Sequence, residues 1–261
     1  MVYATDKNFR KPSRVCDTYK LGISRAFEEL GAVTTGPRYA IYYAPEPGSP
    51  LHAFGQSWFT DAQGASVATS ISPERIQELS ENSRRYGFHG TLKPPFGLNP
   101  ASSLESLLAA ARIFARTLAP IELPPLELAI IGKFIALTPI TQSAALEKLA
   151  AACVRAFEAF RAPLTHEQLE NYKLNRLTVH QEQMLENWGY PYVMEEFRFH
   201  ISVTDRIEDS RERYDVVEAL ERLAAPILGK PITVRELTVF SQSAIDEPMI
   251  PIERIPFGRG K

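Results

Sequence analysis

Two short segments of the sequence carry a histidine, a hydroxyl residue and hydrophobic residues in the same order. They are residues 88–92, FHGTL, and residues 199–203, FHISV. Successive side chains of a β-strand point to opposite faces, so each segment would place its imidazole and its hydroxyl on one face. Two such strands side by side would form a paired-histidine site suited to acid–base chemistry on a phosphate ester.

The residue types on these faces match the needs of phosphodiester chemistry. Because the ordinary pKa of histidine is near 6.5, one of His89 and His200 could accept a proton while the other donates one to a leaving oxygen. The hydroxyls of Thr91 and Ser202 could donate to phosphoryl oxygens, and Lys93 and Arg198 on the same faces could offset the developing charge. No metal or cofactor is required, and the near equivalence of the segments leaves open which histidine is the base.

The bare pattern has low specificity, since serine or threonine follows two places after a histidine by chance about one time in eight. Matched flanks and matched positions along the chain strengthen it. His52, His166 and His180 lack cysteine or histidine partners at metal-ligand spacing, and no HExxH occurs. There is also no GxxxxGK[ST] phosphate loop and no GxGxxG before a helix, which argues against a P-loop nucleotidase or a dinucleotide fold.

Composition indicates a folded protein with a small anionic ligand. The chain has 261 residues, is 44% hydrophobic, and has 29 basic against 31 acidic residues. This balance gives no overall positive field, so a small phosphorylated substrate is expected and long nucleic acid is not. Only Cys16 and Cys153 occur, and no apolar leader or membrane-length run is present, which together predict a cytoplasmic protein that does not span a membrane.

The predicted elements follow one order twice: strand, helices, histidine strand, helix, strand. Residues 1–36 are an appendage with a possible short helix over 19–30, and two lobes of about 37–132 and 133–261 follow it. We expect an α+β fold with two pseudo-symmetric antiparallel sheets, helices on their outer faces and a groove between the lobes. The expected elements are strands at 38–43, 88–92, 126–131, 134–137, 199–203, 232–240 and 249–255, and helices at 51–60, 73–80, 103–118, 143–160, 178–188 and 211–224.

A longer set of motifs resembles a known family. These are RYAIY with PxPGSPL at 38–51, RYGFHGTLKPPF at 85–96, WGYPY at 188–192 and FRFH at 197–200. From about residue 38 to the C-terminus the sequence is similar to the 2H phosphoesterase superfamily, in the bacterial branch encoded with phosphonate-degradation genes. The resemblance implies a bilobed fold with both motif strands at the base of a central groove.

The resemblance also implies roles for individual residues. His89 and His200 would be the catalytic pair, with Thr91 and Ser202 as phosphate donors; serine stands at 202 where the superfamily more often has threonine. A metal-independent cyclic phosphodiesterase is implied, and the phosphonate setting suggests phosphoribosyl 1,2-cyclic phosphate as the substrate. Candidates for holding a second phosphate or a ring are Arg84, Arg85, Tyr86, Tyr190 and Tyr192.

Two alternatives remain open at this stage. The same chemistry could process RNA ends that carry a 2′,3′-cyclic phosphate, which would favour a basic groove. A non-catalytic protein that binds a phosphorylated metabolite is the other alternative, and it would not need both histidines.

Overall fold

The computed structural model of the protein describes residues 36–174 and 176–258. Its helices and antiparallel sheets confirm the expected α+β class. The appendage up to residue 35, including Cys16 and the helix expected at 19–30, lies outside the described residues.

One sheet of seven strands organises the fold, in the order β4-β5-β6-β2-β1-β8-β9, and each neighbouring pair is antiparallel. A separate small sheet joins β3 and β7. The strands are β1 (Arg38–Tyr43), β2 (Gly90–Gly97), β3 (Ile121–Leu123), β4 (Leu126–Ile131), β5 (Phe134–Pro139), β6 (Ile201–Ser202), β7 (Ile232–Val234), β8 (Glu236–Gln242) and β9 (Ile250–Pro256).

The pairing of strands differs from the expected division at residue 132. Strand β4 from the first half of the chain pairs with β5, and β8 from the second half pairs with β1. Each side of the sheet is therefore assembled from both halves of the chain. The strand expected over 232–240 is also split, because β7 belongs to the small sheet and β8 to the large one.

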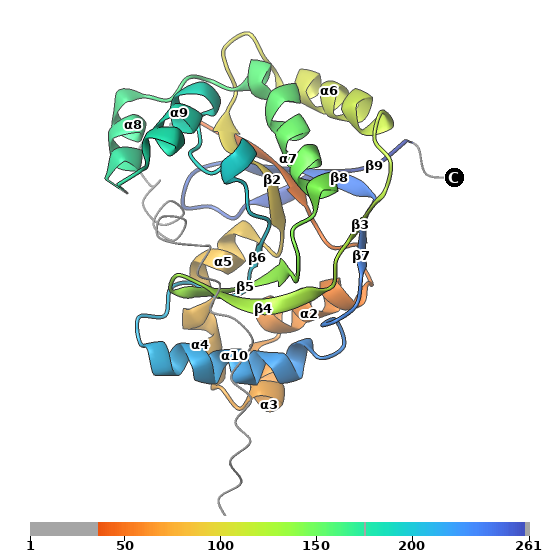
Figure 1. Ribbon diagram of the computed structural model, residues 1–261, viewed down its shortest axis with the longest axis vertical. Helices are drawn as coiled ribbons and strands as arrows, with labels where there is room; N and C mark the ends of the chain where they lie inside the picture. Colours follow the sequence, from red (N-terminus) through yellow and green to blue (C-terminus); the bar gives the residue numbers. More distant parts are fainter. Residues whose placement is uncertain (1–35, 175, 259–261) are drawn as a thin grey trace, which may run out of the picture.

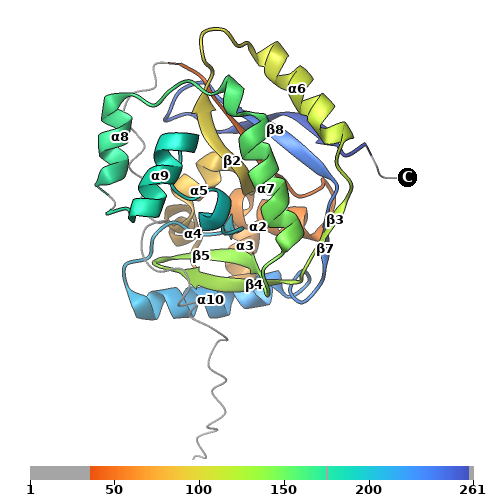
Figure 2. The same ribbon diagram turned by 45° about the horizontal axis from the view of Figure 1, so that its top comes forward.

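Helices cover the sheet in two groups (Figures 1 and 2). Helix α10 packs against β4 and β5 and contacts α3, while α7 packs on β2 and α6 lies along β8 and β9. Three helices of the structure, α3, α5 and α8, were not expected from the sequence pattern. The helices are α2 (Pro50–Thr60), α3 (Ala62–Thr69), α4 (Pro73–Leu79), α5 (Glu81–Tyr86), α6 (Leu104–Arg116), α7 (Ala144–Ala156), α8 (His166–Lys173), α9 (Val179–Trp188) and α10 (Ser210–Ala224), with short 3-10 turns η1 (Glu158–Phe160) and η2 (Met194–Glu196).

Local sequence explains where these helices begin and which face they bury. Proline stands at the first position of α2 and of α4, after the N-cap serines Ser49 and Ser72. Helix α9 has a capping box between Thr178 and Gln181. Apolar residues recur every three or four positions along α7, and the side chains that it buries are Leu146, Leu149, Ala150, Cys153 and Val154.

Strand β1 is buried on both faces. Tyr39, Ile41 and Tyr43 belong to the main hydrophobic core, whereas Ala40 and Tyr42 lie in a separate cluster on the opposite face.

None of the helices in the described part of the chain is long and apolar enough to cross a membrane.

Gly90 permits the close approach of the two histidine segments, and replacing it should separate them. A Cβ at Gly90 would lie 2.3 Å from Cε2 of Phe199, whose ring is buried, whereas one at Gly97 of the same strand would meet nothing nearer than 4.0 Å. We expect Gly90→Ala to lower the free energy of unfolding by about 1–3 kcal/mol through overpacking. Chemical denaturation would measure this, with Gly97→Ala as the matched control. Equal stability of the two variants would contradict the conclusion that the close approach of the two histidine segments requires glycine at position 90.

Candidate active site

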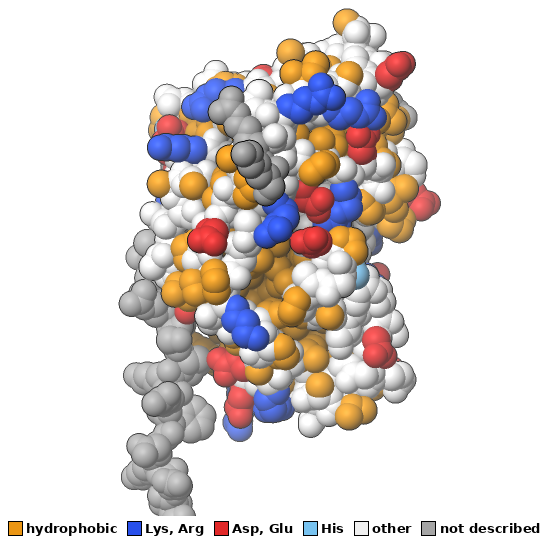
Figure 3. All heavy atoms as spheres, turned by 90° about the vertical axis from the view of Figure 1, so that its right-hand side faces the viewer, with side chains coloured by type: hydrophobic (Ala, Val, Ile, Leu, Met, Phe, Trp, Pro, Cys, Tyr) orange, Lys and Arg blue, Asp and Glu red, His pale blue; other side chains and the backbone are white. Residues whose placement is uncertain are grey.

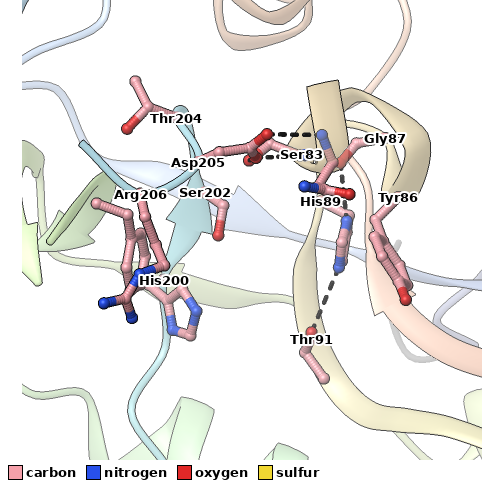
Figure 4. Close-up of a pocket in the computed structure, with 12 residues that line it drawn as sticks. Ser83, Tyr86, Gly87, His89, Thr91, His200, Ser202, Thr204, Asp205 and Arg206 are labelled. Carbon is pink, nitrogen blue, oxygen red and sulfur yellow. Dashed lines mark hydrogen bonds between the residues drawn. The ribbon is translucent and has the colours of Figure 1, made fainter. Parts of the chain in front are cut away.

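The two histidine segments lie side by side, as their pattern predicts. Strands β2 and β6 are antiparallel neighbours that pair through Gly90 and Ile201. His89 immediately precedes β2 and His200 immediately precedes β6, and both line one pocket of about 610 Å³. Figure 4 shows their rings on opposite sides of this space, which we call the histidine pocket.

His89 is held by a backbone hydrogen bond and by ring stacking. Its Nδ1 lies 2.9 Å from the carbonyl oxygen of Gly87, and its ring stacks on Tyr42 with 3.7 Å between centroids and 18° between planes. Only 8% of the residue is exposed. Burial lowers the pKa of His89 from its ordinary 6.5 to about 4; the hydrogen bond to Gly87 opposes this shift and charge on His200 adds to it. His89 is therefore neutral at physiological pH.

His200 is fixed in the same manner. Its Nδ1 lies 2.9 Å from the carbonyl oxygen of Arg198, and its ring is near that of Phe134, with 5.8 Å between centroids. Burial lowers the pKa of His200, and the backbone hydrogen bond opposes that shift. Because a carbonyl oxygen can only accept, Nδ1 donates in both histidines, and Nε2 is the other ring nitrogen at which each imidazole can gain or lose a proton.

The two hydroxyls of the motifs also line the histidine pocket. Thr91 Oγ1 lies 3.3 Å from Nε2 of His89, to which the hydroxyl donates when the ring is neutral. Ser202 pairs with Ala136 in the sheet and points its hydroxyl into the space between the imidazoles (Figure 4). Two imidazoles and two hydroxyls therefore face one cavity.

Lys93 is not part of this pocket. Thr91 and Lys93 of β2 pair with the adjacent residues Tyr42 and Ile41 of β1, so a bulge interrupts the alternation between them. Lys93 is 1% exposed, and its Nζ lies 3.0 Å from Glu158 Oε2. Burial lowers the pKa of Lys93, and Glu158 opposes that shift.

Arg198 and two of the tyrosines lie beside the histidine pocket. The segment before β6 is not extended strand, and Nη1 of Arg198 donates to the carbonyl oxygens of Glu195 and Phe197 at 2.8 and 2.6 Å. Arg198, Tyr190 and Tyr192 line a neighbouring hollow that shares Thr91 and His200 with the histidine pocket. They flank the paired histidines without standing between them.

The remaining candidates come from α5. Tyr86 lines the histidine pocket, and its hydroxyl accepts from Nη2 of Arg38 at 3.3 Å. Arg85 lies 4.0 Å from Asp246 and Arg84 is exposed; neither lines the pocket. The turn of α5 that carries them thus contributes only its tyrosine.

The structure adds a cation that sequence reasoning missed. Arg206 lines the histidine pocket beside His200 and lies 3.4 Å from the exposed carboxylate of Glu208 (Figure 4). Residues 200, 202, 204 and 206 are all polar, and all four line this pocket. The face predicted from the sequence extends backwards from His200 to Arg198. Extending it forwards from Ser202 would have identified Arg206.

Asp205 connects the two histidine segments through α5. Its carboxylate accepts from the backbone N–H groups of Asn82 and Ser83, both at 2.7 Å, and from the Ser83 hydroxyl at 2.6 Å. These N–H groups belong to the first turn of α5, which the N-cap Ser80 leaves without a side-chain partner. The carboxylate therefore fixes the start of the helix that leads into His89.

No group of three or more histidine, cysteine, aspartate or glutamate side chains that could hold a metal ion occurs within residues 36–174 and 176–258. The side chains that line the pocket include two imidazoles, the two hydroxyls of the motifs and one guanidinium. These groups can exchange protons with a bound anion and donate hydrogen bonds to it.

Comparison with known proteins finds relatives that are longer than this chain. Two curated proteins named ribose 1,5-bisphosphate phosphokinase PhnN are similar: that of Janthinobacterium sp. (strain Marseille) is 33% identical over 86% of this chain and 52% of its own length. That of Laribacter hongkongensis (strain HLHK9) is 30% identical over 74% of this chain and 45% of its own. The chain thus spans about half the length of these relatives.

Solved structures show a more distant similarity. One described as a phosphoesterase is 14% identical, with a TM-score of 0.40 over 85% of this chain and 98% of its own. One of E. coli LigT complexed with 3′-AMP is 11% identical, with a TM-score of 0.39 over the same shares.

One family is matched over most of the described chain. Residues 91–250 fit the profile of the family described as protein of unknown function (DUF1045). This span contains Thr91, His200, Ser202 and Arg206, and it begins two residues after His89. The protein belongs to the DUF1045 family.

Proposed function

We propose that this protein is a metal-independent cyclic phosphodiesterase that acts on a small phosphorylated substrate. The observation that carries the proposal is the pair of imidazoles at the starts of adjacent strands, each with Nδ1 fixed to a backbone carbonyl and each accompanied by a hydroxyl. We assign proton exchange to the Nε2 atoms, one taking a proton on one side of a phosphoryl group and the other delivering one on the opposite side.

The electrostatics favour His89 as the base and His200 as the acid. Positive charge on His200 lowers the pKa of His89, which burial already depresses to about 4. When His200 carries the proton, as the acid must, its charge keeps His89 neutral, as the base must be. An anionic phosphodiester between the rings stabilises that proton, because an opposite charge raises a histidine pKa.

The reaction then needs one water. Nε2 of His89 takes a proton from the water as its oxygen attacks phosphorus, and Nε2 of His200 gives its proton to the departing ester oxygen. The Thr91 hydroxyl breaks its hydrogen bond with Nε2 of His89 and donates to a phosphoryl oxygen instead. Ser202 and Arg206 donate to the other phosphoryl oxygens. One P–O bond forms and one breaks, and the histidine pair finishes with its proton on the other ring.

The named relatives support a particular substrate. Their name refers to ribose 1,5-bisphosphate, and this chain, which spans about half their length, has no GxxxxGK[ST] phosphate loop. Hydrolysis of 5-phosphoribosyl 1,2-cyclic phosphate with cleavage of the bond between phosphorus and O2 yields ribose 1,5-bisphosphate. We therefore propose this cyclic ester as the substrate, so that the product is the compound named for the relatives.

An RNA end with a cyclic phosphate receives less support from the overall charge of the protein. On the face shown in Figure 3, basic and acidic side chains are interspersed and neither sign predominates. The net charge of −2 agrees with this. A small substrate is the better match.

Both histidines should be required for turnover. We expect His89→Ala and His200→Ala each to reduce kcat by at least about a hundredfold, the usual contribution of a general acid or base. Ribosyl 1,2-cyclic, nucleoside 2′,3′-cyclic, nucleoside 3′,5′-cyclic phosphates and cyclic-ended RNA would be assayed in EDTA. His180→Ala, at an exposed position on α9, is the control. Full activity in either variant would refute the paired-histidine mechanism.

The pH dependence should show an acidic optimum. The pKa values of both free histidines lie below 6.5, so His200 loses its proton as pH rises through that range, while His89 gains one only near pH 4. We expect a bell-shaped profile of kcat/KM with its maximum below pH 6.5 and a kcat profile displaced upward, because the bound anion raises both pKa values. A kcat/KM maximum above pH 6.5 would contradict these protonation states.

Arg206 should contribute through its charge. Hydrogen bonds from charged groups are worth about 1.5–3 kcal/mol, so Arg206→Gln should lower kcat/KM by roughly ten- to a hundredfold, with partial rescue by Arg206→Lys. Arg211→Gln, at an exposed position in the first turn of α10, is the matched control. If both glutamine variants behave alike, Arg206 does not contact the substrate.

A further inference from the structure

A second hollow of about 1150 Å³ lies between the start of β1, the end of β2 and the start of α8. It shares no lining residue with the histidine pocket. Its polar side chains come from Arg38, Arg161, Thr165, Gln168 and Tyr172. We call it the Arg38 hollow.

Arg38 is a buried cation without a compensating carboxylate. The residue is 6% exposed, and across residues 36–174 and 176–258 no Asp or Glu forms an ion pair with it. Its Nε donates to Gln242 Oε1 at 2.9 Å, and Nη2 donates to the same oxygen and to the Tyr86 hydroxyl. No described group hydrogen-bonds with its Nη1. Because burying an unpaired charge is costly, the geometry suits an anion supplied from outside.

The guanidinium is held in place rather than left loose. The side-chain amide of Gln242 donates to the carbonyl oxygens of Ile245 and Glu247 at 3.0 and 2.7 Å, which turns its Oε1 toward Arg38. This fixes the Arg38 fork before any ligand arrives. Pre-organised guanidinium groups are well matched to phosphate oxygens.

The lining of the Arg38 hollow adds positive charge and donors. No Asp or Glu is among the described residues that line it. Arg161 lies 2.6 Å from Glu158, but that carboxylate also lies 3.0 Å from Lys93, so two cations share one anion. Burial raises the pKa of Tyr172, which keeps its hydroxyl protonated and able to donate.

One strand face connects the Arg38 hollow with the histidine pocket. Arg38, Ala40 and Tyr42 alternate along β1 onto the face on which Tyr42 stacks with His89. Tyr86 lines the histidine pocket, and its hydroxyl touches Arg38. Ala40 and Tyr42 are buried, so Tyr86 is the residue through which the guanidinium adjoins the histidine pocket.

We propose that Arg38 binds a phosphate monoester, and that this group is the remote phosphate of the substrate whose cyclic phosphate reacts in the histidine pocket. The identification of this group as the remote phosphate of the substrate rests on the proposed function. Binding of a phosphate monoester at Arg38 stands on the buried charge alone.

The test compares ribose 1,2-cyclic phosphate with and without a 5-phosphate. Arg38→Gln should lower kcat/KM for the 5-phosphorylated substrate at least about tenfold more than for the other, with partial recovery in Arg38→Lys. The control is Arg254→Gln, a guanidinium at the other end of β1 that pairs with Glu236 and donates to the Ala44 and Pro45 carbonyls. It should not change the ratio. If Arg38→Gln does not fold, Tyr172→Phe should shift the ratio in the same direction.

Calorimetry with ribose 5-phosphate separates this proposal from the proposed function. If wild-type protein turns over no cyclic phosphate, the proposed function fails, yet binding of ribose 5-phosphate that weakens at least tenfold in Arg38→Gln still supports the site. The same loss of binding with an unchanged kinetic ratio identifies the phosphate as that of a separate ligand. Equal binding by both proteins, together with an unchanged ratio, overturns the proposal.

Discussion

The candidate site depends on the junction between β2 and β6. These strands pair through only one position, Gly90 opposite Ile201, yet this pairing brings the two histidines into one pocket. The ring of Phe199 passes where a Gly90 side chain would stand, so the approach is possible only because that side chain is missing. Asp205 makes a second connection at the first turn of α5. His89 is thus fixed between a helix and a strand that are both attached to the His200 segment.

Close packing at this junction also determines the protonation of the site. Tyr42 covers one face of His89 and removes water from it, and both histidines have pKa values lowered by burial. A resting pair of neutral imidazoles cannot act as acid and base at once. The proton that the reaction needs is stabilised only when an anion enters, so ligand binding and activation of the site are one electrostatic event.

The sequence predicted which of the motif's polar side chains share a pocket, because strand alternation is a local property. His89 with Thr91 and His200 with Ser202 share a pocket as expected. Lys93 does not, because a bulge after Thr91 sends it to Glu158. A bulge depends on how the partner strand pairs, which the local pattern does not record.

Long-range pairing was likewise beyond local reasoning. The division into two sequential lobes was inferred from a repeated order of elements, but β1 pairs with β8, about 200 residues later. Arg198 was placed on a strand face, although β6 begins only at Ile201 and the arginine donates to carbonyls of its own segment. Arg206 lines the histidine pocket instead, and Arg38 contacts Tyr86 of that pocket; neither position could be recognised without the tertiary structure.

The two arginines have different consequences for catalysis if they bind different phosphates. A remote phosphate does not change during ring opening, so contacts with Arg38 are equally strong in the ground state and the transition state. Such uniform binding lowers KM without raising kcat. Charge develops only on the phosphoryl group between the histidines, and donors aimed there, including Arg206, can favour the transition state. The Arg38 hollow would therefore select the substrate, while the histidine pocket, held by the β2–β6 junction, would supply the rate.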